Sequence, residues 1–567
     1  MRPVIRDFQM TDGIANSERL TFSPRNVYKE GFHPTPTVKY QEPKKQLAPP
    51  TFSNRYFVTG VLSLPYAEIK EPFTAWYDAA NEMSRIDYYG DMVQTYQRAD
   101  EKSYGNSYKV TPMTNEIVKN VKSCFRVNGT ANATVAVQSI LPDTTGFVHL
   151  RNDTLDDDDC EVWHNVTVDG GKVNRYTLWL RRDAAGAPVP LRYEMRGYDT
   201  LLGSHYDKYE IAYADYDASP FNPAVFDVPA GLTCGGFPGP GVERRALANP
   251  MREYVAGDDA HAHESFTQYR ERHGRRYDDE REHKLRKHVF RNNLRFIHST
   301  NRANLGYQLA VNHLADRTDD ELRATRGRLT SPHPNGKAFD KARYKGQAVP
   351  DSLDWRINGA VTPVKDQAVC GSCWSFGSTG AIEGALFVKT GQLVRLSQQN
   401  LMDCSWGYGN NACDGGEEWR SYEWAMKHGG IMSEDDYGSY IGQNGYCSFN
   451  PAKVATKVSG YVNVTSGDQE ALKLALVNHG PVAVGIDASH KSLSFYANGV
   501  YYEPACGNTS DDLDHAVLAV GYGTLNGQPY WLIKNSWSTY WGNDGYVLMS
   551  QKDNNCGVAT DATFVTI

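Results

Sequence analysis

The sequence predicts a multidomain α+β protein, with a β-rich N-terminal half and a mixed helical and stranded C-terminal half. The chain has 567 residues, too many for one hydrophobic core, and a chain of this length suggests roughly three or four domains. Residues 55–236 contain short runs of β-branched and aromatic residues separated by turn residues, as antiparallel strands do. From residue 261 onward, apolar positions recur at helical spacing instead.

Composition argues against two classes of partner. The formal net charge is −8 and no basic block is present, so no nucleic acid is expected. The mean hydropathy is −0.56 and no apolar run is long enough to span a bilayer, so no membrane span is expected either.

Seven of the ten cysteines lie in the last 200 residues. If Cys373 is free, the other six could form three disulfides, which favours an oxidising compartment.

The N-terminal third is expected to consist of a tail and a sheet. Residues 1–54 are polar and rich in proline, which predicts an extended tail, either a spacer or a segment lying along a partner. Residues 55–236 predict a twisted antiparallel sheet, closed toward a barrel. The expected strands are 56–64, 134–137 paired with 146–150, a hairpin of 176–180 and 191–195, and 209–213.

No catalytic constellation is found in this β-rich domain, and a binding or chaperone role is only a hypothesis. The acidic run Asp156–Asp159 predicts a solvated loop, because a calcium site needs spaced ligands that are absent here. Cys124 and Cys160 could pair, which would leave Cys234 without a partner in this domain.

Residues 237–260 predict a linker, since they are entered through consecutive glycines and prolines. A helix is expected to follow, because six residues are spaced by three or four positions and share one helical face. These residues are Glu282, Arg286, Phe290, Asn293, Ile297 and Asn301. Residues 330–348 are again polar and proline-containing, which predicts an exposed hinge where proteolytic cleavage would fall.

The candidate reactive group is Cys373, in the segment Cys370-Gly-Ser-Cys-Trp374. A helix is predicted to start here, and the positive end of its dipole would favour the thiolate. A zinc site at Cys370 and Cys373 is not expected, because no second Cys/His pair is suitably spaced. The sequence therefore predicts neither a metal nor a cofactor.

These segments resemble the papain family of cysteine proteases over residues 349–567. Cys-Gly-Ser-Cys-Trp is a signature of that family. His515 lies 142 residues beyond Cys373 in an apolar run, and Asn535 precedes Ser-Trp. The six-residue helical stripe resembles the inhibitory propeptide of cathepsin L-like members, which extends the resemblance back to residue 261. The resemblance implies a helical lobe plus a β-barrel lobe, preceded by a propeptide at 261–348.

The resemblance also implies a role for each site residue. Cys373 would be the nucleophile, and His515 would accept its proton and later protonate the leaving amine. Asn535 would orient the imidazole, and the side-chain amide of Gln367 would stabilise the oxyanion. Trp537 would shield the bond between His515 and Asn535 from water.

Substrate contacts are implied at several further positions. Gly415 and Gly416 match the family's glycine wall, whose backbone pairs with an extended substrate. Glu417, Glu418 and Asp561 fall at the S2 pocket, where carboxylates would favour Arg or Lys as well as bulky apolar side chains. Asp514 is a further candidate substrate-binding residue.

The resemblance implies three disulfides and shows five departures from the family pattern. The implied pairs are Cys370 with Cys413, Cys404 with Cys447, and Cys506 with Cys556. The departures are Ala310 and Leu314 in a second propeptide motif, Ala368 after the oxyanion glutamine, and Ser538 and Tyr540 after Asn-Ser-Trp.

The predicted function is that of a cysteine endopeptidase made as a propeptide-inhibited zymogen, opened by acid as Glu282, Asp316 and their neighbours are protonated. Its partners would be peptide and protein substrates and its own propeptide. The layout resembles insect haemocyte two-chain cysteine proteases and counting-factor-associated proteins, which implies that the N-terminal domain stays attached after cleavage. The resemblance and the cysteines favour a lysosomal or extracellular location. Because Met1–Asp7 shows no secretory signal, an intracellular scaffold with an uncleaved propeptide stays open as the alternative.

Overall fold

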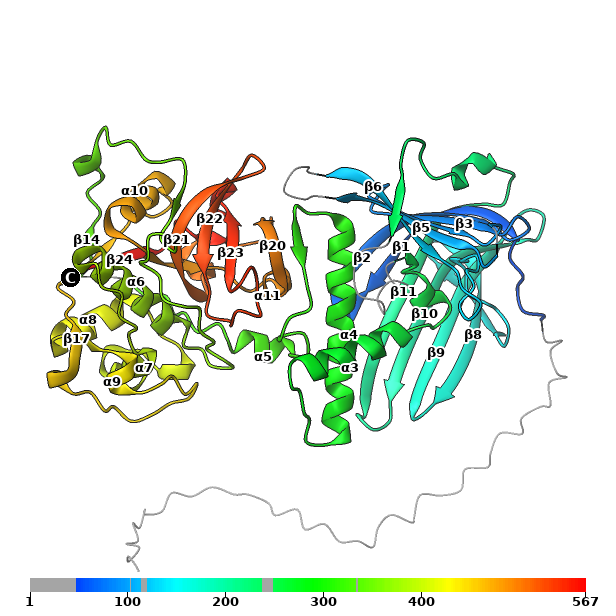
Figure 1. Ribbon diagram of the computed structural model, residues 1–567. Coiled ribbons are helices and arrows are strands. Elements are labelled where there is room, and N and C mark those ends of the chain that lie inside the picture. The colour runs from blue at the N-terminus through cyan, green and yellow to red at the C-terminus, as the bar shows by residue number, and fades with distance from the viewer. Residues whose placement is uncertain (1–46, 102, 114–119, 237–247, 333–334) are drawn as a thin grey trace, which may run out of the picture. The chain divides into compact units, whose positions relative to one another are not determined.

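The computed structural model describes residues 47–101, 103–113, 120–236, 248–332 and 335–567 (Figure 1). Most of the predicted tail and residues 237–247 of the predicted linker therefore lie outside the described residues. In the part of the chain that is described, no helix combines the length and apolar character needed to cross a membrane.

The described residues of the N-terminal β-rich region form a twelve-stranded sheet in the order β12-β6-β5-β4-β3-β2-β1-β11-β10-β9-β8-β7 (Figure 1). Neighbouring strands are antiparallel except β12, which runs parallel to β6. The strands are β1 (Arg55–Leu64), β2 (Ile69–Asp78), β3 (Met83–Tyr88), β4 (Val93–Arg98), β5 (Asn106–Met113), β6 (Val121–Asn128), β7 (Val148–Leu155), β8 (Asp158–Asp169), β9 (Lys172–Arg182), β10 (Pro188–Asp199), β11 (Ser204–Asp217) and β12 (Cys234–Gly236).

This sheet confirms part of the prediction and corrects the rest. The predicted strand 56–64 and the predicted hairpin form as β1 and as β9 with β10. Closure toward a barrel is wrong for the described residues, because β12 and β7 are the two ends of the strand order. The strand expected at 134–137 is also wrong. Its backbone is used elsewhere, since the Val135 N–H donates to the Tyr104 carbonyl at 2.8 Å.

The cysteine pairing expected in this region is wrong as well. Cys124 forms a disulfide with Cys234, which joins β6 to β12, and Cys160 is a buried free thiol. Asp156 and Asp157 of the acidic run form the exposed turn between β7 and β8, in the left-handed region at φ of 51° and 71°, whereas Asp158 and Asp159 are exposed residues at the start of β8.

Among the described residues, four helices follow the sheet and precede the C-terminal region: α2 (Arg252–Val255), α3 (Ala260–Arg272), α4 (Glu280–Ala303) and α5 (Asp319–Arg323). α2 falls inside the predicted linker and packs on the sheet, because the Tyr209 hydroxyl donates to the Tyr254 carbonyl at 2.8 Å. α4 carries all six residues of the predicted stripe. It starts where the Asp279 side chain accepts from the Glu282 N–H, and it ends at Asn304 in the left-handed region.

The C-terminal region combines a helical part with a second sheet. The helices are α6 (Cys373–Thr390), α7 (Gln398–Cys404), α8 (Glu418–His428), α9 (Glu434–Tyr437), α10 (Gln469–His479) and α11 (Lys491–Ser494). The strands are β15 (Leu353–Asp354), β16 (Ile431–Met432), β17 (Val454–Thr456), β18 (Gly460–Asn463), β19 (Val482–Ile486), β20 (Tyr496–Tyr501), β21 (His515–Leu525), β22 (Gln528–Lys534), β23 (Tyr546–Ser550) and β24 (Ala562–Thr566). Disulfides join Cys370 to Cys413, Cys404 to Cys447, and Cys506 to Cys556.

The segment before residue 349 adds a strand at each end of this second sheet. The sheet order is β13-β20-β23-β22-β21-β19-β24-β18-β14. β13 (Tyr307–Leu309) pairs antiparallel with β20, and β14 (Lys337–Ala338) pairs parallel with β18. Beyond Phe339, which is buried, most residues of 340–348 are exposed. The segment is therefore anchored at both ends and accessible next to residue 349.

Candidate active site

Cys373 is the first residue of α6, and its side chain is fully buried. Burial raises the pKa of the thiol to about 12, against the lowering effect of the backbone N–H groups of Ala516 and Gly327. The expected thiolate is therefore absent in this covered state. The helix N-terminus favours the anion, but loss of water from around the sulfur outweighs it.

His515 begins β21 and is held by Asn535, which follows β22. The His515 Nε2 lies 2.8 Å from the Asn535 Oδ1, which also accepts the N–H of Ser536 at 2.7 Å. Since that oxygen is an acceptor, the imidazole carries its hydrogen on Nε2. His515 Nδ1 has no hydrogen-bond partner among the described residues. The Trp537 ring lies 4.7 Å from the imidazole, and burial lowers the pKa of His515 to about 4. The histidine is thus neutral, with a free acceptor on Nδ1.

Gln367 is oriented by the loop that follows β22. The Ser536 hydroxyl donates to its Oε1 at 2.5 Å, which leaves the NH₂ group of the amide to point the other way. That group donates to the carbonyls of Thr325 at 2.7 Å and Cys370 at 2.8 Å. The proposed oxyanion donor is therefore occupied by a carbonyl of the segment that precedes residue 349.

Residues 325–330 cover the thiol, from a turn at Thr325 to a β-bridge between Arg328 and Gly416. The Gly327 N–H points at the Cys373 Sγ, at 3.4 Å. On one side, the Gly416 N–H donates to the Gly327 carbonyl at 2.9 Å. On the other side, the Arg328 N–H donates to the Asp514 carbonyl at 3.0 Å. A Cβ atom at Gly327 would lie 1.9 Å from the Gly371 carbonyl oxygen, so only glycine fits here.

The side chain of Arg328 fills an acidic pocket beside the thiol. It is 1% exposed, and its guanidinium lies 2.9 Å from Asp561 Oδ2 and 3.4 Å from Glu418 Oε1. A Cβ atom at Gly485 in β19 would lie 2.8 Å from this guanidinium, so the missing side chain makes room for it. Two of the three predicted pocket carboxylates thus contact a cation.

Glu417 and Gly415 are placed differently. Glu417 is buried and pairs with Arg420 at 2.6 Å while accepting from the Ser331 hydroxyl. Gly415 has φ of +114°, and a Cβ there would lie 3.0 Å from the Gly327 carbonyl oxygen. Both residues therefore line the path of the covering segment, although neither touches the guanidinium of Arg328 within the described contacts.

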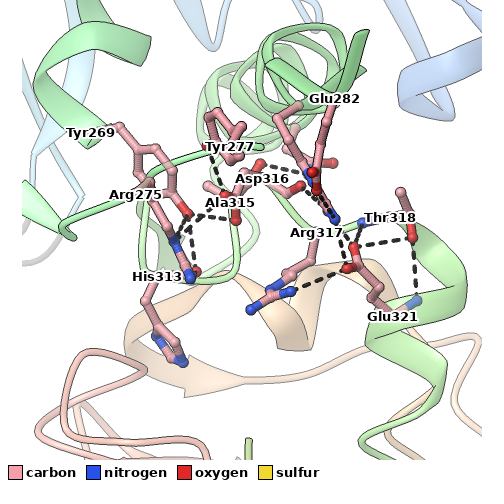
Figure 2. A network of polar contacts seen from close by, with 12 residues as sticks. Tyr269, Arg275, Tyr277, Glu282, His313, Ala315, Asp316, Arg317, Thr318 and Glu321 are labelled. Atoms are coloured by element: carbon pink, nitrogen blue, oxygen red, sulfur yellow. Dashed lines mark hydrogen bonds and ion pairs between the residues drawn. The ribbon is translucent and has the colours of Figure 1, made fainter. Parts of the chain in front are cut away.

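A polar network ties Asp316 and Glu321, which precede the covering segment 325–330, to α3 and α4 (Figure 2). Asp316 accepts from the hydroxyls of Tyr269 at 2.7 Å and Tyr277 at 2.9 Å. Arg286 donates to the Asp316 carbonyl at 3.0 Å and pairs with Glu321. Burial raises the pKa of Glu321, but the hydrogen bonds from Arg286 and the Thr318 N–H, together with the charges of Arg286 and Arg317, lower it to about 2.

The predicted stripe of α4 donates hydrogen bonds mainly to backbone carbonyls of residues 309–316. Asn293 donates to the Ala315 carbonyl and Asn301 to the Leu309 carbonyl, each at 2.9 Å. Asn312 in turn donates to the Ser494 carbonyl of the C-terminal region at 2.8 Å. The stripe thus positions residues 309–316 on the C-terminal region.

Three of the departures from the family pattern have visible consequences. Ala368 and Ser538 stand where glycine or a small residue is usual, and both adopt left-handed backbone conformations, with φ of 56° and 66°. Tyr540 is 60% exposed, and its ring contacts those of His273 and His313. Tyr540 therefore adds a contact between the loop after β22 and two histidines that precede the covering segment.

The only group of candidate metal ligands found among the described residues is Asp487, His490 and Cys506. Cys506 is bonded to Cys556 in a disulfide. Its sulfur therefore cannot act as a thiolate ligand, and the remaining two groups pair with each other at 3.4 Å.

Two family models match the chain. The model described as "Papain family cysteine protease" matches residues 349–566, and the "Cathepsin propeptide inhibitor domain (I29)" model matches residues 266–322. About 260 residues form an extra N-terminal region.

Similar proteins include "Digestive cysteine proteinase 1" of Homarus americanus, 44% identical over 54% of this chain and 96% of that protein. A "Cathepsin L-like peptidase" of Aedes aegypti is 46% identical over 53% of this chain and 92% of that protein. Among solved structures, digestive procathepsin L2 from the larval midgut of Tenebrio molitor is 35% identical, with a TM-score of 0.51 over 54% of this chain and all of that one. The chain therefore belongs to the papain family of cysteine proteases and carries a cathepsin-type propeptide.

Sequence reasoning missed Gly327, Arg328 and Gly485. Gly327 and Arg328 lie between the two matched segments, where no motif marked them. The available signal was charge: an arginine in the propeptide that could complement the acidic pocket residues. Gly485 gave no sequence signal, because its role depends on a side chain from another segment.

Proposed function

We propose that Cys373, His515, Asn535 and Gln367 hydrolyse peptide bonds in this papain-like cysteine endopeptidase. The observation that supports the assignment is the free Nδ1 of His515, with Nε2 bound to Asn535. Once the site is uncovered, Nδ1 takes the thiol proton of Cys373, and the sulfur attacks the substrate carbonyl carbon. The oxyanion is held by the Gln367 amide and the Cys373 N–H.

The imidazolium of His515 then gives its proton to the leaving amine, and a thioester with Cys373 remains. Water attacks the thioester as His515 takes a proton from it, and the acid product leaves with the thiol restored. Trp537, whose ring lies tilted 4.7 Å from the imidazole, keeps water from the bond between His515 and Asn535. Asp514 contributes a backbone carbonyl to the bound chain, and Gly415 and Gly416 form the opposite wall.

The covering segment explains why the site is latent. The group at the sulfur is the Gly327 N–H, a donor with no electrophilic carbon. The β-bridge between Arg328 and Gly416 is parallel, so we propose that a substrate runs antiparallel there. Residues 261–348 would be the propeptide and 349–567 the mature enzyme. Cleavage is proposed in the exposed stretch 340–348, to give a mature chain that begins near Val349.

We also propose that the S2 pocket accepts arginine. Arg328 occupies the pocket through Asp561 and Glu418, and a substrate arginine would use the same carboxylates. Cleavage rates for matched peptides with Arg, Phe or Leu at the P2 position test this proposal. If the enzyme cleaves the Phe and Leu peptides but ignores the Arg peptide, the pocket assignment is wrong.

The catalytic assignment is tested by comparing the two free cysteines of the described residues, Cys373 and Cys160. A thiol-directed epoxide should label the activated wild type and Cys160→Ala, but not Cys373→Ala. Only the last variant should lose peptidase activity. Gln367→Ala should retain labelling while kcat falls about 10²–10³-fold. Peptidase activity in the Cys373→Ala variant would refute the proposal that Cys373 is the nucleophile.

The compartment is proposed from the disulfides. Four disulfides form in the described part of the chain, and such bonds persist in oxidising surroundings. We propose a secreted or lysosomal protein, as expected for a relative of digestive proteinases and cathepsin L. The alternative of an intracellular scaffold is not favoured.

A further inference from the structure

Helix α4 has a second polar face, distinct from the stripe that holds the propeptide. Its six residues are spaced by four, three, four, four and three positions, so they share one side of the helix. They are Lys284, His288, Arg291, Arg295, Ser299 and Arg302. We call this set the arginine face. It points at the N-terminal β-rich region, since α4 contacts β2 (Figure 1).

The C-terminal end of the arginine face meets a buried carboxylate on β2. Arg302 lies 2.7 Å from Glu71, and the Ser299 hydroxyl donates to the same carboxylate at 2.9 Å. Glu71 is fully buried and Arg302 is 6% exposed. The Tyr89 hydroxyl also bonds Ser299, at 2.8 Å. Glu71 thus has its cation on α4, 231 residues away in the sequence.

The middle of the face repeats this arrangement on β11. Arg295 makes two contacts with Asp207, at 2.7 and 3.2 Å, and a third with Glu253 of α2 at 2.7 Å. Arg291 lies 3.2 Å from the same Asp207, which is 2% exposed. At the N-terminal end, Lys284 and His288 lie 3.9 and 3.6 Å from Asp199.

Each arginine also lies over a tyrosine of the preceding region. The guanidinium centres of Arg291, Arg295 and Arg302 lie 5.3, 5.2 and 5.4 Å from ring centroids. The rings are those of Tyr206, Tyr254 and Tyr88, in the same order. A carboxylate and an aromatic face therefore receive each arginine, and such a planar, bidentate site discriminates arginine from lysine.

The arginine face of α4 and the sheet surface that carries Glu71 and Asp207 stabilise each other. A buried carboxylate without its cation is strongly destabilising, so both carboxylates must be exposed to water when α4 leaves. The first stripe of the same helix holds residues 309–316, and residues 325–330 cover Cys373. The N-terminal region is thus coupled through α4 to the segment that covers the thiol.

We propose that the N-terminal β-rich region and α4 form one inhibitory unit, in which Glu71 and Asp207 hold the arginine face and so keep the propeptide on the active site. The proposal rests on the proposed function, because peptidase activity at Cys373 is its readout. Processing then releases the sheet and α4 together as a single fragment. The N-terminal region stays with the catalytic region for as long as α4 does.

The first experiment uses the full-length zymogen and three variants. Glu71→Gln and Asp207→Asn each remove one carboxylate from the arginine face. Asp153→Asn is the matched control, since in the described contacts the Asp153 carboxylate pairs with the exposed Arg151 of the same sheet and accepts the adjacent Thr154 N–H. At a fixed acid pH, the first two variants should process at least about tenfold faster than wild type, and the control at the wild-type rate. Equal rates in all four proteins would overturn the proposal.

A rescue variant separates loss of the contact from a general folding defect. Glu71→Met combined with Arg302→Met removes both charges, which is close to neutral where one unpaired charge is not. This double variant should process more slowly than Glu71→Gln. If it processes as fast, the pair does not hold the propeptide. Complete digestion by an added protease should yield the same final activity in every variant, and activity in none would refute the proposed function instead.

The second experiment uses the wild-type protein alone. Products of processing are separated by size, and their masses and N-terminal sequences are determined. The expected fragment contains both the sheet and α4, and it inhibits freshly activated enzyme when added back. If the chain is cut between residues 237 and 280 before activity appears, or if the fragment does not inhibit, the single inhibitory unit does not exist.

Discussion

Replacement of Arg328 by alanine should open the zymogen at neutral pH. The guanidinium is 1% exposed and pairs with Asp561, whose side chain is 17% exposed, and with Glu418 at 5%. Removal of one partner from a buried pair costs roughly 3–5 kcal/mol. Because Asp561 keeps some contact with solvent, we take the lower end, about 3 kcal/mol. That value corresponds to an approximately 100-fold increase in the open fraction.

The assay is the rate at which a thiol-directed epoxide labels Cys373 in intact zymogen, before any cleavage. Labelling needs an uncovered sulfur, so the rate follows the open fraction. Arg323→Ala is the matched control, because Arg323 is 70% exposed and pairs with the exposed Asp320. It should change the rate less than about twofold. Arg328→Lys should fall between alanine and wild type. An Arg328→Ala rate within threefold of wild type would refute the reasoning.

Three further predictions concern the covering segment and the site beneath it. Gly327→Ala should raise labelling of intact zymogen more than tenfold, because its Cβ would lie 1.9 Å from a backbone oxygen. A wild-type rate would show that the close approach is not required. Gly485→Ala should lower kcat/KM for peptides with Arg at P2 about tenfold more than for Leu peptides, because its Cβ would meet the guanidinium at 2.8 Å; an equal loss would contradict this. Processing should accelerate as pH falls from 6.5 to about 4, since burial lowers the pKa of His313 and His515 to about 4 from an ordinary 6.5. The covered form then binds fewer protons than the open form, so acid favours opening, by up to roughly 3 kcal/mol for each histidine. Processing rates that do not change between pH 6.5 and 4 would refute the assignment of the acid response to His313 and His515.

The N-terminal sheet was predictable where its strands alternate buried and exposed residues. In β1 the buried Tyr56 and Val58 alternate with less buried neighbours, which is the period that the sequence displays. Residues around 134–141 were not predictable, because their partners are distant side chains. The Tyr56 hydroxyl accepts the Ile140 N–H, and the Tyr213 hydroxyl donates to its carbonyl, each at 3.0 Å. Local pattern carries no information about such contacts.

In the site, residue types and spacing were enough to nominate Cys373, His515 and Asn535 as a set. The protonation states of Cys373 and His515 could not be predicted from the sequence, because they depend on which residues cover the thiol. The expected acid trigger shows the same limit. The sequence pointed to Glu282, Asp316 and their neighbours, and for the first two this stays a prediction. The neighbouring Glu321 stays ionised at pH 4, because hydrogen bonds from Arg286 and the Thr318 N–H lower its pKa to about 2 against the opposing effect of burial. The buried His313 and His515, whose pKa values are lowered to about 4, are groups that gain protons on opening between pH 6.5 and 4.

Latency in this protein has an electrostatic part as well as a steric part. A helix N-terminus favours a thiolate by about 2 kcal/mol at most. Burial under the propeptide raises the pKa of Cys373 from 9.0 to about 12, which opposes ionisation by roughly 4 kcal/mol. The covered pair of Cys373 and His515 is therefore neutral, and water must enter before the ion pair can form. A propeptide that shifts without admitting water to Cys373 would leave the enzyme inactive. Activation therefore requires that Arg328 leaves the acidic pocket and Gly327 leaves the sulfur together.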